Sequence, residues 1–231
     1  MNKEANGLES ELYQPVKDYL TSIGFSVRGE VGKCDVVGVN GDRMVVVELK
    51  RTFSLSLLYQ AAARLKLSPE VFVAIPFPDM QPKRGKVFRQ LESMTQVCAA
   101  MGIGLLSVGS QGVFVHCLPR IGKATNPRAK RKLLREFGGR SGDHNVGGTT
   151  SRERVTAYRE AALKCLKSLV DNGQARPARI KAETGVEKAG GILHRNVYGW
   201  FNRVGHGVYA ATDKGTEALL RYGHVVNAMA V

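Results

Sequence analysis

Three charged residues, Asp35, Glu48 and Lys50, have the types and the spacing of a hydrolytic site. Glu48 and Lys50 end the run 44–50, which is otherwise apolar and predicts a strand that is buried on both faces. Charges at the end of a buried strand are costly unless they are paired or bind a cation. Because residues two apart on a strand point the same way, Glu48 and Lys50 are expected on one side.

Asp35 is brought to the same side by a hairpin turn at 40–42, whose sequence is Asn-Gly-Asp. If the first two of these residues form the turn, Asp35 lies opposite Val46; if the last two form it, Asp35 lies opposite Glu48. Opposite residues share a face, so both registers bring Asp35 to the side of Glu48 and Lys50, with the carboxylates about 5 Å or about 7–8 Å apart. A three-residue loop would instead move Asp35 to the other face.

Two carboxylates and a lysine suit the metal-dependent hydrolysis of phosphodiester bonds. Carboxylate oxygens bind Mg²⁺ or Mn²⁺, and such an ion polarises a phosphate and lowers the pKa of water. Lys50 can orient the water and offset the negative charge of the transition state. The alternative is that all three residues are solvated charges at the end of a sheet.

The elements that must position these residues predict an α/β fold with a mixed sheet flanked by helices. Apolar residues at helical spacing predict helices at 8–23, 54–67 and 83–101. Short apolar runs predict strands at 25–30, 34–39, 44–50, 71–75, 103–108 and 113–118.

This order of elements, and the twelve residues between Asp35 and Glu48-Leu49-Lys50, resemble the PD-(D/E)XK nuclease superfamily with its D…(D/E)xK signature. Nearly the whole chain is similar to a largely uncharacterised bacterial family of PD-(D/E)XK-like phosphodiesterases. The stretches that carry this similarity are ESELYQPVKDYL, GEVGKCDVV, VVVELKR and RNVYGWFNRVGHGVYA. The resemblance implies a restriction-endonuclease-like fold and a metal site.

The resemblance also implies further site residues. Several superfamily members use a glutamate of the first helix, which Glu11 matches, and related nucleases place a glutamine near the site, which Gln60 matches. The alternatives are a solvent-facing helix charge for Glu11 and a polar residue on a helix rim for Gln60. Glu30 is a weaker candidate, and Cys34 stands where many relatives have proline.

The basic residues indicate a polyanionic partner, for which nucleic acid is the usual candidate. The net charge of the 231 residues is +14. Residues 1–118 hold 13 Lys and Arg against 11 Asp and Glu, whereas residues 119–140 hold 8 against 1. Contact with backbone phosphates is therefore expected from the basic run, although such runs are usually only solvated. Its residues are Arg128, Lys130, Arg131, Lys132 and Arg135.

A glycine-rich stretch at 141–151 marks a domain boundary. We expect a nuclease-like domain at 1–118, a basic linker at 119–150, in which a short helix is allowed, and a second domain at 151–231. Predicted helices at 152–171, from 177, near 192–200 and after 212, with a strand at 208–210, favour a small winged helix-turn-helix.

A winged helix of this kind would place side chains in the major groove of DNA, although many winged helices bind protein instead. The expected residues are Lys188, His194, Arg195 and Asn196 on the recognition helix, and Arg203 and His206 on the wing.

Several classes of protein are disfavoured by the sequence. No apolar run approaches the length of a membrane helix, and the polar N-terminus does not resemble a signal peptide, so we expect a cytoplasmic protein. The four cysteines form no CxxC pair, which disfavours a structural zinc site or a disulfide framework. The sequence has no Walker A, GxGxxG, GxSxG or HExxH motif.

The function predicted from the sequence is therefore hydrolysis of nucleic acid, with DNA favoured. Asp35 and Glu48 would bind Mg²⁺ or Mn²⁺, Lys50 would assist the water, and Glu11 and Gln60 would complete the site. The main alternative is a non-catalytic DNA-binding regulator that uses the winged helix on a nuclease-like scaffold. An enzyme that acts on RNA is a third option, and the oligomeric state is left open, a homodimer included.

Overall fold

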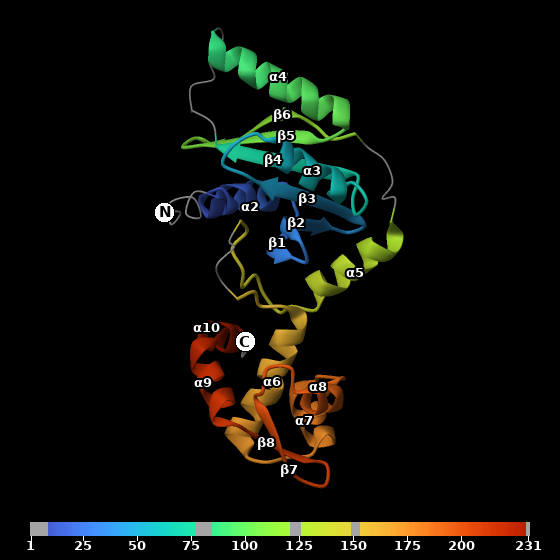
Figure 1. The fold of residues 1–231 in the computed structure, drawn as a ribbon, viewed down its shortest axis with the longest axis vertical. Coiled ribbons are helices and arrows are strands. Elements are labelled where there is room, and N and C mark those ends of the chain that lie inside the picture. The colour runs from blue at the N-terminus through green and yellow to red at the C-terminus, as the bar shows by residue number, and fades with distance from the viewer. Residues whose placement is uncertain (1–8, 77–84, 121–125, 149–152, 230–231) are drawn as a thin grey trace. The chain divides into compact units, whose positions relative to one another are not determined.

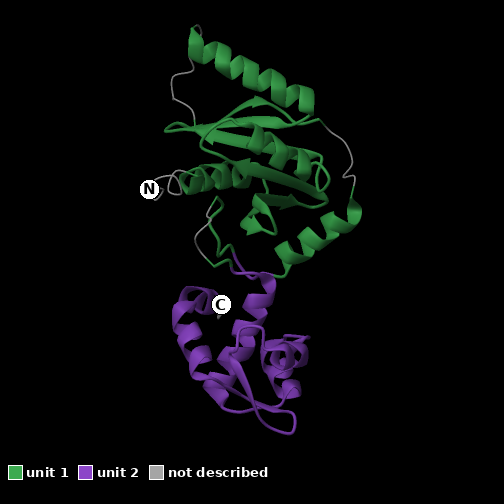
Figure 2. Ribbon diagram, in the orientation of Figure 1, with its two compact units in different colours: residues 1–139, 143–154 green, residues 140–142, 155–231 purple. Residues whose placement is uncertain are grey.

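The computed structural model describes residues 9–76, 85–120, 126–148 and 153–229. The chain divides into two compact units, which Figure 2 shows in different colours. Unit 1 consists of residues 1–139 and 143–154, and unit 2 of residues 140–142 and 155–231. Among the described residues, no helix has the length and apolar composition to cross a membrane.

Unit 1 is built on a six-stranded sheet whose strands lie side by side in chain order (Figure 1). The first three strands and the last two pair antiparallel, whereas β3, β4 and β5 pair parallel, so the sheet is mixed as the sequence predicts. The strands are β1 (Ser26–Val31), β2 (Cys34–Asn40), β3 (Arg43–Leu49), β4 (Glu70–Pro76), β5 (Gly104–Gly109) and β6 (Gly112–Cys117).

Helices flank this sheet because its central strands are apolar on both faces. Helix α2 (Tyr13–Ser22) shares one core cluster with Val47, whereas α3 (Leu55–Arg64) and α4 (Lys86–Met101) share another with Val46. Successive residues of a strand point to opposite faces, so β3 contributes to both clusters. The charged end of β3 therefore lies within reach of helices on both sides of the sheet.

The hairpin between β2 and β3 uses the second of the two predicted registers. Asn40 pairs with Arg43 and Val36 pairs with Val47, so Gly41 is the first turn residue and has a positive φ of 55°. Glycine adopts this conformation without steric cost. Continuing the register by one pair places Asp35 opposite Glu48.

Helix α3 begins and ends with residues that matter for the site. The Ser54 hydroxyl caps the helix by accepting a hydrogen bond from the Leu57 N–H. Leu57 and Ala61 are fully buried, and Arg64 follows them at the spacing of one helix face. Gln60 lies one turn before Arg64, so both polar residues are at the C-terminal end of a helix that packs on β3 and β4.

Helix α5 (Pro127–Gly138) lies within the segment 119–150 that was expected to be a basic linker, in which a short helix was allowed. Its Leu133 and Phe137 lie in the core cluster of α3, and the Arg28 guanidinium lies 4.6 Å from the Phe137 ring centroid. The expected linker therefore differs from the units of the structure, which assign this helix to unit 1. The physical reason is the amphipathic pattern: its apolar side is buried while its basic side faces solvent.

Unit 2 consists of helices and one hairpin around a separate core that includes Leu163, Leu166, Ile180 and Trp200. Thr212 caps α9, with its hydroxyl accepting a hydrogen bond from the Gly215 N–H. The elements are α6 (Ala157–Asn172), α7 (Pro177–Thr184), α8 (Ala189–Arg195), β7 (Phe201–Gly205), β8 (Val208–Ala211), α9 (Asp213–Arg221) and α10 (Gly223–Ala228).

The helix predicted near 192–200 is too long, since α8 ends at Arg195. Asn196 has a left-handed φ of 43°, and its side-chain amide bonds both the N–H and the carbonyl of Phe201. Asparagine tolerates this conformation and often ends a helix in it. Asn196 is therefore a structural residue of the turn into β7, and its expected place on an exposed recognition face is wrong.

Candidate active site

Charged side chains from four elements converge where β3 ends. Strands β2 and β3 contribute two carboxylates, and the residue directly after β3 contributes a lysine. Helix α3 contributes a guanidinium, and the helical turn before α2 contributes a further carboxylate. We call these residues the charged cluster: Glu9, Asp35, Glu48, Lys50 and Arg64.

Asp35 is tied to β3 through the backbone. Its Oδ2 accepts a hydrogen bond of 2.9 Å from the N–H of Leu49. Burial raises the pKa of Asp35 above its ordinary value, while the Leu49 N–H and the positive charges of Lys50 and Arg64 lower it. The carboxylate is thus fixed in a half-buried position where an additional cation would stabilise its charged form.

Glu48 is the most buried member of the charged cluster, with 1% of its surface exposed. Its Oε1 accepts a hydrogen bond of 2.7 Å from Nε of Arg64, and its Oε2 lies 3.4 Å from Nη2 of the same guanidinium. Burial, followed by the negative charge of Asp35, raises the pKa of Glu48 to about 7, although Arg64 opposes this shift. One arginine therefore does not fully compensate the two carboxylates.

Lys50 does not share a partner with Glu48. Its Nζ lies 3.3 Å from both carboxylate oxygens of Glu9, and its backbone N–H donates to the carbonyl of Ala74. The expectation of a shared face rested on strand alternation, but β3 ends at Leu49, so alternation no longer fixes the direction of Lys50. Its positive charge still acts on Asp35, whose pKa it lowers, as does the charge of Arg64.

The first helical segment contributes Glu9 to the cluster in place of the expected Glu11, which is exposed. Glu9 precedes Tyr13 and Val16 at intervals of four and three residues, and both are buried against the sheet. Residues at this spacing share a helix face. The buried helix face that contains Tyr13 and Val16 was therefore the sequence signal that favoured Glu9 over Glu11 as the site residue.

Gln60 presents a buried side-chain oxygen, Oε1, which has no hydrogen-bond partner within the described residues. Leaving such a group unsatisfied costs about 1–3 kcal/mol. It lies one turn before Arg64 on the face of α3 that packs on the sheet. An unpaired amide oxygen here is available to a cation or water.

Glu30 and Cys34, also considered from the sequence, have other roles. Glu30 is buried and its Oε2 lies 2.5 Å from Nη2 of Arg154, which also donates to the Gly32 carbonyl. Burial raises the pKa of the Cys34 thiol to about 12. Cys34 is therefore a neutral buried thiol and not a nucleophile.

The glycine-rich stretch 143–148, expected to be a connector, is part of unit 1 and lies beside the cluster. Asp143 accepts hydrogen bonds from the Tyr13 hydroxyl at 2.6 Å, Nζ of Lys17 at 2.5 Å and the Gly29 N–H at 2.9 Å. These bonds join the helix that follows Glu9 to β1. We call residues 143–148 the glycine strap.

The glycines of this strap make close backbone contacts with two cluster residues. A Cβ at Gly147 would lie 2.6 Å from the Asp35 carbonyl oxygen, and one at Gly148 would lie 3.0 Å from the carbonyl oxygen of Glu9. Real Cβ atoms essentially never approach a backbone atom as closely as the 2.6 Å that a Cβ at Gly147 would require. Glycine is therefore required at Gly147 by space, and the strap forms one wall beside the cluster.

The cluster fits a hard divalent cation. Asp35 and Glu48 offer carboxylate oxygens from opposite positions, and burial raises the pKa of both, so a cation would stabilise their charged forms. Gln60, one turn before Arg64, has an amide oxygen with no hydrogen-bond partner among the described residues. In the described part of the chain, no three His, Cys, Asp or Glu side chains form a group that could hold a metal. The protein would thus supply two carboxylates, which is common for Mg²⁺, since water and substrate phosphate fill its other positions.

The predicted phosphate-binding residues are mostly exposed. Arg128, Arg131 and Arg135 line a hollow of about 600 Å³ on α5 together with Leu134. The other residues of the set are Lys130, whose Nζ donates to the Asp42 carbonyl, and exposed Lys132, Lys188, Arg195 and Arg203.

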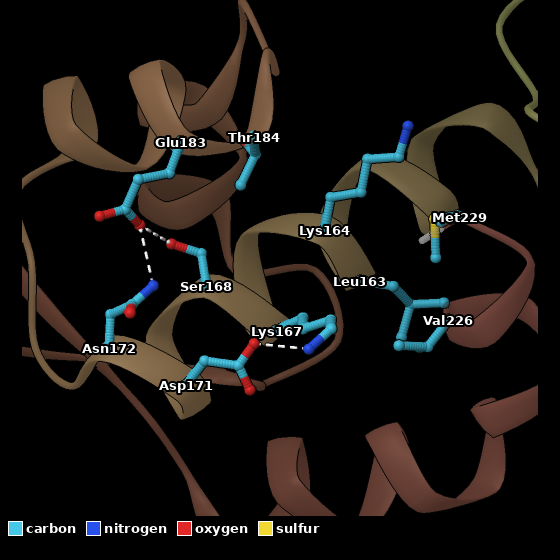
Figure 3. Close-up of a pocket in the computed structure, with 10 residues that line it drawn as sticks. All are labelled: Leu163, Lys164, Lys167, Ser168, Asp171, Asn172, Glu183, Thr184, Val226 and Met229. Carbon is cyan, nitrogen blue, oxygen red and sulfur yellow. Dashed lines mark hydrogen bonds and ion pairs between the residues drawn. The ribbon is translucent and has the colours of Figure 1, made fainter. Parts of the chain in front are cut away.

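A second hollow, of about 310 Å³, lies in unit 2 between α6, α7 and α10 (Figure 3). Its polar side chains already bind one another: Glu183 accepts from Ser168 and Asn172, and Lys167 pairs with Asp171 at 2.5 Å. This hollow therefore offers few free polar groups, and we do not assign chemistry to it.

Comparison with known proteins supports the class of enzyme that this site suggests. A family model described as "Putative PD-(D/E)XK phosphodiesterase (DUF2161)" matches residues 105–218. The matched region runs from β5 into α9 and does not include Asp35, Glu48 or Lys50, so these assignments rest on geometry. No curated protein and no solved structure matches the chain. Residues 105–218 are thus similar to a family whose description suggests a nuclease-like hydrolase.

Proposed function

We propose that this protein is a metal-dependent phosphodiesterase that hydrolyses nucleic acid, with DNA the favoured substrate. The observation that carries the proposal is the pair of carboxylates, Asp35 and Glu48, which lie opposite each other at the end of a mixed sheet with Lys50 beside them. The description of the matching family agrees with this reaction type.

In this proposal Asp35 and Glu48 hold Mg²⁺ or Mn²⁺, and the Gln60 oxygen completes the protein's side of the site. When bound, the cation supplies Lewis-acid activation of phosphate and water. Lys50 carries the ammonium that stabilises negative charge on the phosphate in the transition state. Glu9 positions that ammonium, since both of its oxygens lie 3.3 Å from Nζ.

Helix α5 supports nucleic acid as the substrate. Arg128, Arg131 and Arg135 are spaced by three and four residues, so they form one stripe along the helix. All three are exposed, and none of their guanidinium groups has a hydrogen bond or ion pair to the described residues. Guanidinium groups without a protein partner suit the phosphates of a nucleic-acid backbone. The flanking basic residues are Lys130 and Lys132.

Unit 2 would then be a winged helix that docks on DNA. Three helices, a hairpin and two further helices follow one another in unit 2, and this order suits a winged helix with α8 as the recognition helix and β7–β8 as the wing. Lys188 and Arg195 are exposed at the two ends of α8, and Arg203 is exposed on β7. These cations would contact phosphates or bases.

A second candidate function is DNA binding without catalysis. The observation that favours it is the contact of Arg64 with both oxygens of Glu48, an arrangement that a purely structural ion pair would also show. Such a regulator would keep the α5 stripe and unit 2 but would not cleave.

The two functions are separated by incubating plasmid, single-stranded and duplex DNA, and RNA, with the protein in Mg²⁺ or Mn²⁺. We expect cleavage that disappears in EDTA and in Asp35→Asn but persists in Asp18→Asn, whose carboxylate is exposed on α2 and bonds Gln14. DNA binding without cleavage of any substrate would favour the regulator.

A further inference from the structure

We infer that Arg64 competes with the divalent cation for Glu48 and thereby lowers the metal affinity of the site. This inference deepens the proposed function and rests on it. Arg64 would be a residue that regulates metal binding, beyond the carboxylates that hold the metal.

The geometry of the pair places Arg64 where a cation would bind. The guanidinium contacts both oxygens of Glu48, with one short bond of 2.7 Å to Oε1 and a longer contact of 3.4 Å to Oε2. The side chains are 13% and 2% exposed, so water screens the pair weakly. A divalent cation on this carboxylate would lie next to a guanidinium of like charge, and the repulsion would weaken its binding.

Arg64 also has a partner that does not depend on Glu48. Its Nη2 lies 2.5 Å from the backbone carbonyl of Lys33, in the turn between β1 and β2. The guanidinium can keep this bond when the carboxylate turns to a metal ion, so releasing Glu48 does not leave a buried charge without any acceptor.

The opposite role, in which Arg64 only holds Glu48 in place, predicts a change of opposite sign. If Arg64 were needed for orientation, its removal would weaken metal binding. If it competes, its removal strengthens metal binding. The sign of one measured change therefore decides between a competitor and a positioning residue.

The test is titration of Mn²⁺ into the wild-type protein, Arg64→Gln and Arg64→Lys by calorimetry at pH 8. We expect Arg64→Gln to lower the Kd for Mn²⁺ by about tenfold, which corresponds to about 1.4 kcal/mol. Arg64→Lys should lower it a few-fold, because lysine lacks the planar fork that spans both oxygens. The control is Arg43→Gln, which removes an exposed ion pair with Glu70 at the other end of β3 and should leave the Kd unchanged.

A Kd that rises or stays constant in Arg64→Gln would overturn the competition, while the metal site itself would stand. Failure of the wild type and of every variant to bind Mn²⁺ would instead overturn the proposed function. If Arg64→Gln does not fold, Arg64→Lys decides, with the rise in Tm on adding Mn²⁺ as a second readout of affinity.

Discussion

Asp35 Oδ2 accepts a hydrogen bond of 2.9 Å from the backbone N–H of Leu49, so the side chain of β2 is anchored to the residue between Glu48 and Lys50. A single bond thus links the three parts of the D…(D/E)xK pattern. The carboxylate keeps its second oxygen for other ligands. Because a substitution can keep the bond to Leu49 and remove only the charge, metal binding by Asp35 can be tested without disturbing the fold.

Asp35→Asn should abolish metal binding with little loss of stability. Asparagine keeps an oxygen that can accept the Leu49 N–H, and burial raises the pKa of Asp35, so removing the charge does not cost folding energy. Calorimetric titration with Mn²⁺ should show no binding, while thermal unfolding in EDTA should give a Tm equal to or above that of the wild type. Metal affinity that survives this change would exclude Asp35 as a ligand.

The raised pKa of Glu48 predicts that stability in EDTA falls as the pH rises. The pKa is about 7 in the folded protein against an ordinary 4.5, so the folded state binds more protons than the unfolded chain between these values. The free energy of unfolding should therefore decrease across this window, by up to roughly 3 kcal/mol from this group.

This pH dependence is measured by urea denaturation from pH 4.5 to 8, with Glu48→Gln as the comparison. The slope should be reduced in Glu48→Gln, and saturating Mg²⁺ should stabilise the wild type most above pH 7. Identical slopes for the two proteins would show that Glu48 titrates normally.

Lys50→Ala should leave metal and DNA binding largely intact but lower the cleavage rate by about 100-fold or more, the scale of one lost transition-state donor. Lys50→Arg should restore little activity, because arginine differs in shape and hydration. Lys86→Ala, which removes an exposed lysine at the start of α4, is the control. An unchanged rate in Lys50→Ala would contradict the role given to its ammonium.

Gly147→Ala should displace the glycine strap. A Cβ at Gly147 would lie 2.6 Å from the Asp35 carbonyl oxygen and 2.7 Å from the Tyr13 ring, so we expect a loss of about 1–3 kcal/mol in unfolding free energy. Mn²⁺ affinity should fall with it. The matched control is Gly190→Ala, where the nearest atom would be 3.6 Å away. Equal stability of the two variants would show that the strap does not pack as described.

Replacing Arg128, Arg131 and Arg135 together by glutamine should weaken DNA binding and reduce the slope of log K against log salt by about 2–3. Fluorescence anisotropy in EDTA, in an Asp35→Asn background, measures binding without cleavage. The control is a second triple glutamine variant, which removes three positive charges from side chains that are ion-paired in unit 2 and should change the slope less. Its residues are Lys167, Arg179 and Lys181. Equal slopes for the two triple variants would contradict a phosphate-binding role for α5.

The sheet and its flanking helices were predictable because apolar periodicity is a local signal. The same signal left two hairpin registers open, and the conformation of Gly41 distinguishes them only in the structure. The glycine strap gave no such signal, since Asp143 bonds Gly29 across 114 positions of the chain. Long-range contacts of this kind cannot be read from spacing along one segment.

Within the candidate site, Asp35 and Glu48 followed from strand alternation, and their metal-binding role stays a prediction. Glu9 was missed because the acidic residue of the family pattern was sought at Glu11, although the buried helix stripe pointed to Glu9. Arg64 was missed because a basic residue at the end of a helix is usually exposed. The helical spacing that puts Arg64 on the same face as the buried residues Leu57 and Ala61 was the sequence signal that it faces the sheet.

The central claim is most directly tested by a crystal soaked in Mn²⁺ and measured for anomalous scattering. We expect one anomalous peak between Asp35 and Glu48, at about 2.0–2.2 Å from carboxylate oxygens of both, with the Arg64 guanidinium moved away from Glu48. A map with no peak there at saturating Mn²⁺, and with Arg64 still bonded to Glu48, would contradict it.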